Sequence, residues 1–126
     1  MCQELGIEAG KDVIPGIANA FAGGIGNTGA VCGAVVGAVM AIGLKQERGK
    51  TMEEMLGNLA VAREFRRRFE AEMGTISCRE LTGVDLNTEE GMKEAMSSDL
   101  ALKVCFPAVG TAYQIALDLL QEPSNI

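Results

Sequence analysis

An apolar, glycine-rich stretch near the start of the chain constrains the fold more than any other part of the sequence. No charged residue interrupts Phe21–Leu44. Small residues recur there every four positions, as Gly29, Gly33 and Gly37 and as Ala30, Ala34 and Ala38. Residues four apart share one helix face, so one side of this helix is almost bare backbone. Because glycine in a helix interior costs about 1 kcal/mol relative to alanine, we expect a neighbouring helix to cross closely at Gly37. We therefore predict that this stretch forms the central helix of the fold, with Cys32 in its first turn.

The composition is that of one all-α domain. The chain has 126 residues, of which 48% are hydrophobic, and a chain of this length buries about two thirds of its unfolded surface in a single domain. With four Phe, one Tyr and no Trp, the core must consist mainly of aliphatic side chains and methionine. Helix-forming residues predominate and strand-like alternation is scarce. We predict a single compact bundle of about five helices, spanning residues 1–126, around the central Gly/Ala-rich helix.

Start and stop signals place the other helices. Three capping boxes occur: Thr51-Met52-Glu53-Glu54, Ser77-Cys78-Arg79-Glu80 and Asn87-Thr88-Glu89-Glu90. They predict a long helix to about residue 73, a short one ending at residue 83 and a weak one over 90–97. The last helix is predicted over 100–121, and short helices over 1–5 and 12–22 precede the central one. The predicted buried stripe of the long helix is Met55, Leu59, Ala62, Phe65, Phe69 and Met73.

Charge and residue content exclude several classes of function. The net charge of −6 argues against a broad nucleic-acid-binding surface. The run Arg66-Arg67-Arg68 has glutamates around it at helical spacing, which predicts a solvated, ion-paired face. The clean helical part of the central stretch would span about 22 Å, short of the ~30 Å of a membrane core, so no membrane span is expected. No secretory signal follows Met1, which favours a cytoplasmic protein. The absence of histidine excludes a His-ligated haem, a mixed Cys/His zinc site and His-based catalytic triads.

The candidate chemistry lies in the cysteines, which are Cys2, Cys32, Cys78 and Cys105. No two form a C-x-x-C pair, so their positions are more informative than their spacing. Cys78 follows a serine cap, Cys32 opens the central helix, and Cys105 precedes Pro107, a residue that favours the first turn of a helix. A helix N-terminus offers free N–H groups and a positive dipole end, which favour thiolate over thiol. We therefore expect a lowered pKa at Cys78. The alternative for each cysteine is a small buried hydrophobe, and this is what we expect of Cys2.

The same segments resemble the C_GCAxxG_C_C family, small proteins thought to be redox-active. The first block is Gly-Gly-Ile-Gly-Asn-Thr-Gly-Ala-Val-Cys-Gly-Ala-Val-Val-Gly-Ala-Val-Met-Ala-Ile-Gly-Leu; the second is Phe65–Phe69 with Ser77-Cys78-Arg79-Glu80-Leu81-Thr82-Gly83-Val84-Asp85-Leu86; the third is Cys105 with Pro107 and the closing helix. The positions that match the family motif are Cys32, Gly33, Ala34, Gly37, Cys78 and Cys105. The resemblance covers roughly residues 4–121 and implies a helical domain whose cysteines serve redox chemistry or bind metal. It also implies a further N-terminal helix with an early cysteine, and we expect this chain to start after that helix. A related domain of split-Soret cytochromes implies an iron–sulfur option, although their haem-attachment Cys-x-x-Cys-His is absent here.

Three hypotheses about function remain open. In the first, Cys32, Cys78 and Cys105 are redox-active residues that bind zinc or an iron–sulfur cluster, both of which prefer thiolate ligands. In the second, two of them cycle between thiol and disulfide in an enzyme and the third resolves the intermediate. In the third, the protein is a structural or partner-binding helical module whose cysteines belong to the core. The first two imply an electron-transfer or redox partner protein, and the glycine face is a candidate surface for a homo-oligomer.

Overall fold

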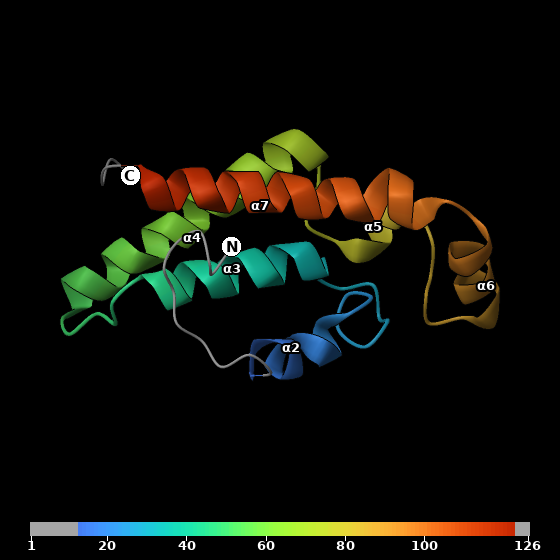
Figure 1. Ribbon diagram of the computed structural model, residues 1–126, viewed down its shortest axis with the longest axis horizontal. Coiled ribbons are helices and arrows are strands. Elements are labelled where there is room, and N and C mark those ends of the chain that lie inside the picture. The colour runs from blue at the N-terminus through green and yellow to red at the C-terminus, as the bar shows by residue number, and fades with distance from the viewer. Residues whose placement is uncertain (1–12, 123–126) are drawn as a thin grey trace.

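The computed structural model describes residues 13–122, and these form helices joined by turns and loops, with one isolated β-bridge between Val31 and Ser77. In chain order the elements are α2 (Val13–Ala18), the 3₁₀ helix η1 (Asn19–Phe21), α3 (Gly33–Lys45), α4 (Met52–Met73), α5 (Cys78–Thr82), α6 (Glu89–Ser97), the π-helical turn η2 (Ala101–Cys105) and α7 (Phe106–Gln121) (Figure 1). The all-α prediction is confirmed. The helix predicted over residues 1–5 lies outside the described residues.

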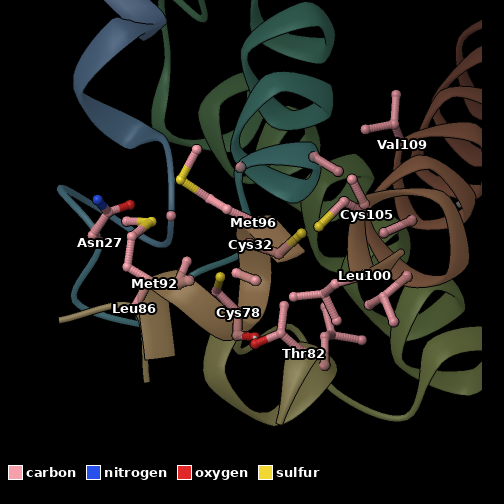
Figure 2. Close-up of a pocket in the computed structure, with 18 residues that line it drawn as sticks. Asn27, Cys32, Cys78, Thr82, Leu86, Met92, Met96, Leu100, Cys105 and Val109 are labelled. Atoms are coloured by element: carbon pink, nitrogen blue, oxygen red, sulfur yellow. The ribbon is translucent and has the colours of Figure 1, made fainter. Parts of the chain in front are cut away.

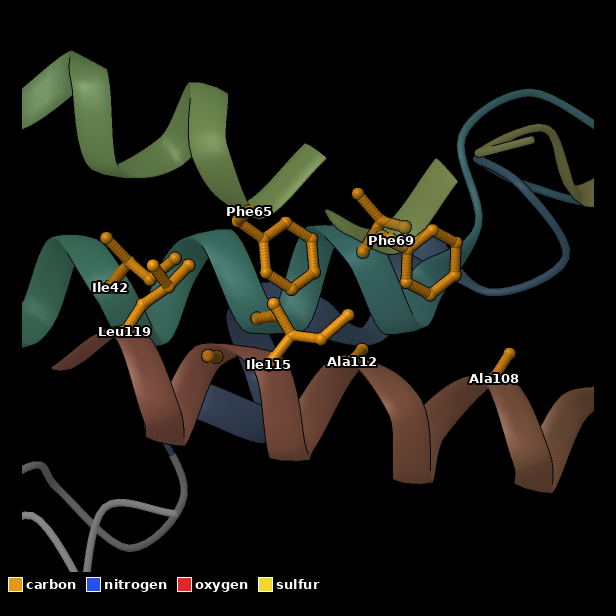
Figure 3. Close-up of a cluster of buried hydrophobic side chains, with 10 residues drawn as sticks. Ile42, Phe65, Phe69, Ala108, Ala112, Ile115 and Leu119 are labelled. Atoms are coloured by element: carbon orange, nitrogen blue, oxygen red, sulfur yellow. The ribbon is translucent and has the colours of Figure 1, made fainter. Parts of the chain in front are cut away.

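Three helices, α3, α4 and α7, build the body of the domain, and each contacts the other two. The helix α6 lies beyond the N-terminal end of α7, away from this body (Figure 1). Where the three helices meet, ten side chains form the core: Val35, Ala38, Ile42, Phe65, Phe69, Ala108, Ala112, Ile115, Ala116 and Leu119 (Figure 3). The rings of Phe65 and Phe69 are fully buried and stack with their centroids 5.9 Å apart. These two phenylalanines from α4 fill the space that the small side chains of α3 and α7 leave open.

The central helix packs through its alanines rather than its glycines. Its buried residues are Val35, Ala38, Ala41 and Ile42. On α7, alanine also recurs every four residues among the buried positions, as Ala108, Ala112 and Ala116. Small side chains on both helices allow their backbones to approach. Gly37 is exposed, and a Cβ atom added there would find no atom within 4 Å. The prediction of a close crossing at Gly37 is therefore wrong.

The bounds of α4 agree with the sequence signals because those signals act locally. The Thr51 hydroxyl accepts a hydrogen bond from the Glu54 N–H at 3.1 Å, and the Glu54 carboxylate accepts one from the Lys50 N–H at 2.7 Å. The helix ends at Gly74, whose φ of +89° is the left-handed conformation that favours glycine. A short capping sequence thus sets each end without help from the rest of the fold.

The buried stripe predicted for α4 is correct only in its C-terminal half. Phe65 and Phe69 are buried, and Ala62 and Met73 are half-buried. Met55 and Leu59 are 44% and 54% exposed, so the prediction is wrong for these two. Helical spacing shows which residues share a face, but not how far along a helix its neighbours extend.

The arginine run lies on an ion-paired surface, as predicted. Arg66 pairs with Glu70 at 2.6 Å, while Arg67 and Arg68 pair with Glu64 at 2.7 and 2.9 Å. Hydrogen bonds from Arg67 and Arg68 lower the pKa of the Glu64 carboxyl to about 2. These arginines are therefore already engaged by carboxylates of the same chain.

Within residues 13–122, no single helix is both long and apolar enough to cross a membrane. The helices 89–97 and 101–121 reach the required length and hydropathy only as a pair, and they are bent by 76° relative to each other.

Candidate functional site

Cys32, Cys78 and Cys105 line one cavity of about 450 Å³ (Figure 2). They come from segments that are far apart in the sequence, and the fold brings all three together. None of the residues that line this cavity is charged, and the only polar side chains among them, apart from the thiols, are Asn27 and Thr82. The cavity lining is therefore apolar, and the three thiols are its main reactive groups. Cys2, the fourth cysteine, lies outside the described residues.

Backbone pairing between two distant segments fixes where Cys32 and Cys78 lie relative to each other. The Cys32 N–H donates to the Ile76 carbonyl and the Cys78 N–H donates to the Ala30 carbonyl, both at 2.7 Å. These two bonds run in opposite directions on either side of the bridge between Val31 and Ser77. Since both bonds are short and reciprocal, the relative position of the two cysteines is fixed by the main chain.

A glycine-rich loop precedes this pairing and explains why it is so close. Six residues of the loop have positive φ: Gly23, Gly24, Ile25, Gly26, Asn27 and Gly29. Gly24 is buried with φ +73°, and a Cβ atom there would lie 2.5 Å from the Ala30 nitrogen and 2.7 Å from the Cys78 Cβ. The loop also delays the start of the central helix to Gly33, later than predicted, and leaves Cys32 as its N-cap residue. The absence of a side chain at Gly24 thus lets the loop press against Cys78.

The expectation of a lowered pKa at Cys78 is wrong. Cys78 is the first residue of α5, as predicted, but the N–H groups at this helix start are occupied: those of Cys78, Arg79 and Glu80 donate to the Ala30 carbonyl, the Gly29 carbonyl and the Ser77 hydroxyl. The guanidinium of Arg79 lies 3.7 Å from the Asp85 carboxylate. Burial raises the pKa of the Cys78 thiol, and the neighbouring thiols of Cys32 and Cys105 raise it further.

Cys105 occupies a continuous helical turn rather than a helix start. It is the last residue of η2, and the next N–H group, that of Phe106, donates to the Ala101 carbonyl five residues back. Pro107 has no N–H, and its ring crowds the carbonyl four residues before it, which explains the wider turn at this point. The free N–H groups expected at Cys105 are therefore absent, and its position depends on the π-helical turn.

The three thiols are close enough to influence one another electrostatically. The sulfurs of Cys32 and Cys105 point toward each other, and Cys78 lies on the adjoining wall (Figure 2). Cys105 is exposed as a residue, but because its sulfur faces the cavity, burial raises the pKa of its thiol, with a further contribution from Cys32. Forming several thiolates in this cavity is therefore unfavourable unless something removes or balances their negative charge.

Side chains from α6, from η2 and from the segments just before these elements complete the cavity, and the sequence did not indicate them as part of the site. The labelled residues on this side include Leu86, Met92, Met96 and Leu100 (Figure 2). The spacing of Met92 and Met96, four residues apart, placed both on one helix face. That spacing could have indicated an apolar wall, but not that the wall faces the cysteines.

No curated protein and no solved structure gave a significant match to this sequence. A family model matches residues 1–119 and is described as "Putative redox-active protein (C_GCAxxG_C_C)". The match includes all the cysteines and nearly the whole described structure. This chain therefore belongs to the C_GCAxxG_C_C family.

Proposed function

We propose that this protein is a redox protein in which Cys32, Cys78 and Cys105 ligate an iron–sulfur cluster. The observation that carries the proposal is that three thiols from distant segments line a single apolar cavity. Cysteine thiolates are the usual ligands of such clusters, and apolar surroundings and solvent exposure are among the factors that set cluster potentials. When bound, the cluster would supply one-electron transfer.

The raised thiol pKa values favour a bound cation over free thiolate chemistry. A cysteine that acts as a nucleophile is normally helped by a nearby positive charge or a free helix N-terminus, which lower its pKa. The cavity offers no charged side chain, and burial raises the pKa values of Cys78 and Cys105. A bound metal centre would itself supply the positive charge that three adjacent thiolates need.

We propose a cluster rather than a single zinc ion. Structural zinc requires four ligands within about 2.3 Å of a single point. Within the described part of the chain, no group of three or more His, Cys, Asp or Glu side chains is arranged to hold one ion. The ligands of a cluster bind different iron atoms and so need not converge on one point. Three of the usual four cysteine ligands come from the cavity, and a fourth ligand would come from elsewhere.

A thiol–disulfide function is the second candidate, favoured by the way the sulfurs of Cys32 and Cys105 point toward each other (Figure 2). Oxidation of this pair would form one S–S bond and release two electrons and two protons to an acceptor. Both candidates imply a redox partner protein and suit the reducing cytoplasm, which we propose as the location.

Iron and acid-labile sulfide measured after anaerobic purification and reconstitution test the proposal. We expect brown protein with a visible absorption band, and Cys32→Ser, Cys78→Ser or Cys105→Ser should each lose most of the iron. Cys2→Ser is the matched comparison, because it reports whether the fourth cysteine is also a ligand. Colourless protein that takes up no iron would refute the cluster. If the same protein loses two thiols on oxidation and regains them on reduction, the thiol–disulfide function is supported instead.

A further inference from the structure

The N-terminal half of α4 carries an apolar patch, which we call the α4 patch, that no other described residue covers. It consists of Met52, Met55, Leu56 and Leu59, which are 66%, 44%, 52% and 54% exposed. Their spacing of i, i+3, i+4 and i+7 places them on one helix face. This face continues the buried stripe of Phe65 and Phe69 toward the N-terminus of α4, where no described neighbour buries it. Contiguous apolar patches on a protein surface commonly mark interaction sites.

Opposite charges border the α4 patch at its two ends. Glu53 lies at the N-terminal end and Arg63 just beyond Leu59. Within residues 13–122, neither makes an ion pair or a side-chain hydrogen bond, whereas nearby Arg66 pairs with Glu70 at 2.6 Å. The patch thus has one unpaired acidic residue at one end and one unpaired basic residue at the other.

We propose that the protein is a homodimer in which the α4 patches of two copies pack antiparallel across a two-fold axis. A two-fold contact must be self-complementary, and this patch meets that requirement in both shape and charge. With the axis near residue 57, Met55 faces the partner's Leu59, and Glu53 lies within one helical turn of the partner's Arg63. The two-fold axis repeats each of these contacts, so each occurs twice in the dimer.

The antiparallel direction follows from the charges. A parallel pair would place Glu53 beside the partner's Glu53 and Arg63 beside the partner's Arg63, and like charges repel. The antiparallel pair joins opposite charges at both ends of the apolar contact. The α4 patch is separate from the residues that line the cysteine cavity, so this proposal does not depend on the proposed redox function.

Sedimentation analysis of the full chain from about 1 to 100 µM, under reducing conditions, tests the dimer. We expect twice the chain mass of 13.2 kDa at the upper end of this range. Leu56→Glu should give a monomer with an unchanged circular dichroism spectrum, because the position is half-exposed. Leu102→Glu is the matched control, since Leu102 is 67% exposed but lies outside the patch, and it should remain dimeric. A monomer at 100 µM, or a dimer that survives Leu56→Glu, would overturn the proposal.

A charge exchange tests the antiparallel arrangement without removing apolar surface. Glu53→Arg or Arg63→Glu alone should weaken dimerisation roughly tenfold, because each places like charges at both symmetry-related contacts. The double variant Glu53→Arg/Arg63→Glu reverses both charges and should restore wild-type affinity. If the double variant dimerises no better than the single variants, the antiparallel pairing is wrong.

Discussion

Gly24 gives the most direct test of how the site is held together. The structure places Gly24 at φ +73°, with the Ala30 backbone and the Cys78 side chain pressed against the space that a Cβ atom would occupy. Gly24→Ala therefore introduces two separate costs, one from backbone conformation and one from steric overlap. Because Ala30 N is a main-chain atom, rotation of a side chain cannot relieve the closer contact.

The two costs can be separated with a neighbouring glycine. An alanine in the left-handed region costs about 1–2 kcal/mol. Gly26 also has positive φ, at +59°, but a Cβ atom there meets nothing within 4 Å, so Gly26→Ala measures the conformational cost alone. At Gly24 the loop must also shift, and losing a hydrogen bond such as that from Ala30 N–H to the Gly24 carbonyl adds about 1 kcal/mol. We expect Gly24→Ala to destabilise the domain by roughly 2–3 kcal/mol in total.

Urea unfolding followed by circular dichroism measures both variants, and thiol labelling reports on the site. Gly24→Ala should lower the stability by at least about 1 kcal/mol more than Gly26→Ala. It should also speed alkylation of Cys78 in the metal-free, reduced protein, because the loop no longer shields that thiol. If both variants have the same stability and leave the labelling of Cys78 unchanged, the contact between the loop and Cys78 does not hold the site.

Three further outcomes follow from the core, the exposed helix face and the thiols. Phe65→Ala should cost about 3–5 kcal/mol in urea unfolding, because it empties a fully buried site. Gly37→Ala should stabilise the protein by up to about 1 kcal/mol, seen as a higher Tm, because helix propensity improves and the added Cβ meets no atom; a lower Tm would show that a neighbour covers this face. Cys32→Ser should lower the pKa values of Cys78 and Cys105, measured as the pH dependence of alkylation in metal-free protein, because one source of thiolate repulsion is gone. A raised thiol pKa means that the fold disfavours thiolate, so the metal-free wild type should lose stability as the pH rises through these values, and the variant should lose less.

The helical class and most helix ends can be derived from the amino-acid sequence alone. Thr51, Gly74 and Gly83 act through hydrogen bonds and backbone conformations within a few residues, so their effect can be derived from adjacent sequence. The same holds for the ion pairs of the arginine run, which join residues three or four apart. Cys32, Cys78 and Cys105 were also identified as the candidate residues from the sequence, through their positions and the family resemblance.

Which helix faces are buried, and what surrounds the thiols, depend instead on contacts between distant segments. The glycine and alanine repeats of α3 are equally regular in the sequence. The alanine face is the buried one because it packs against the matching alanines of α7. From the sequence, the start of α5 resembles a site that stabilises thiolate. In the folded protein its N–H groups donate instead to the carbonyls of Ala30 and Gly29, which are distant in the sequence. The methionines of α6 line the cavity only because folding brings α6 next to the cysteines. The pKa of a thiol depends on burial and on charges brought close by folding, and neighbouring residues in the sequence do not encode either quantity.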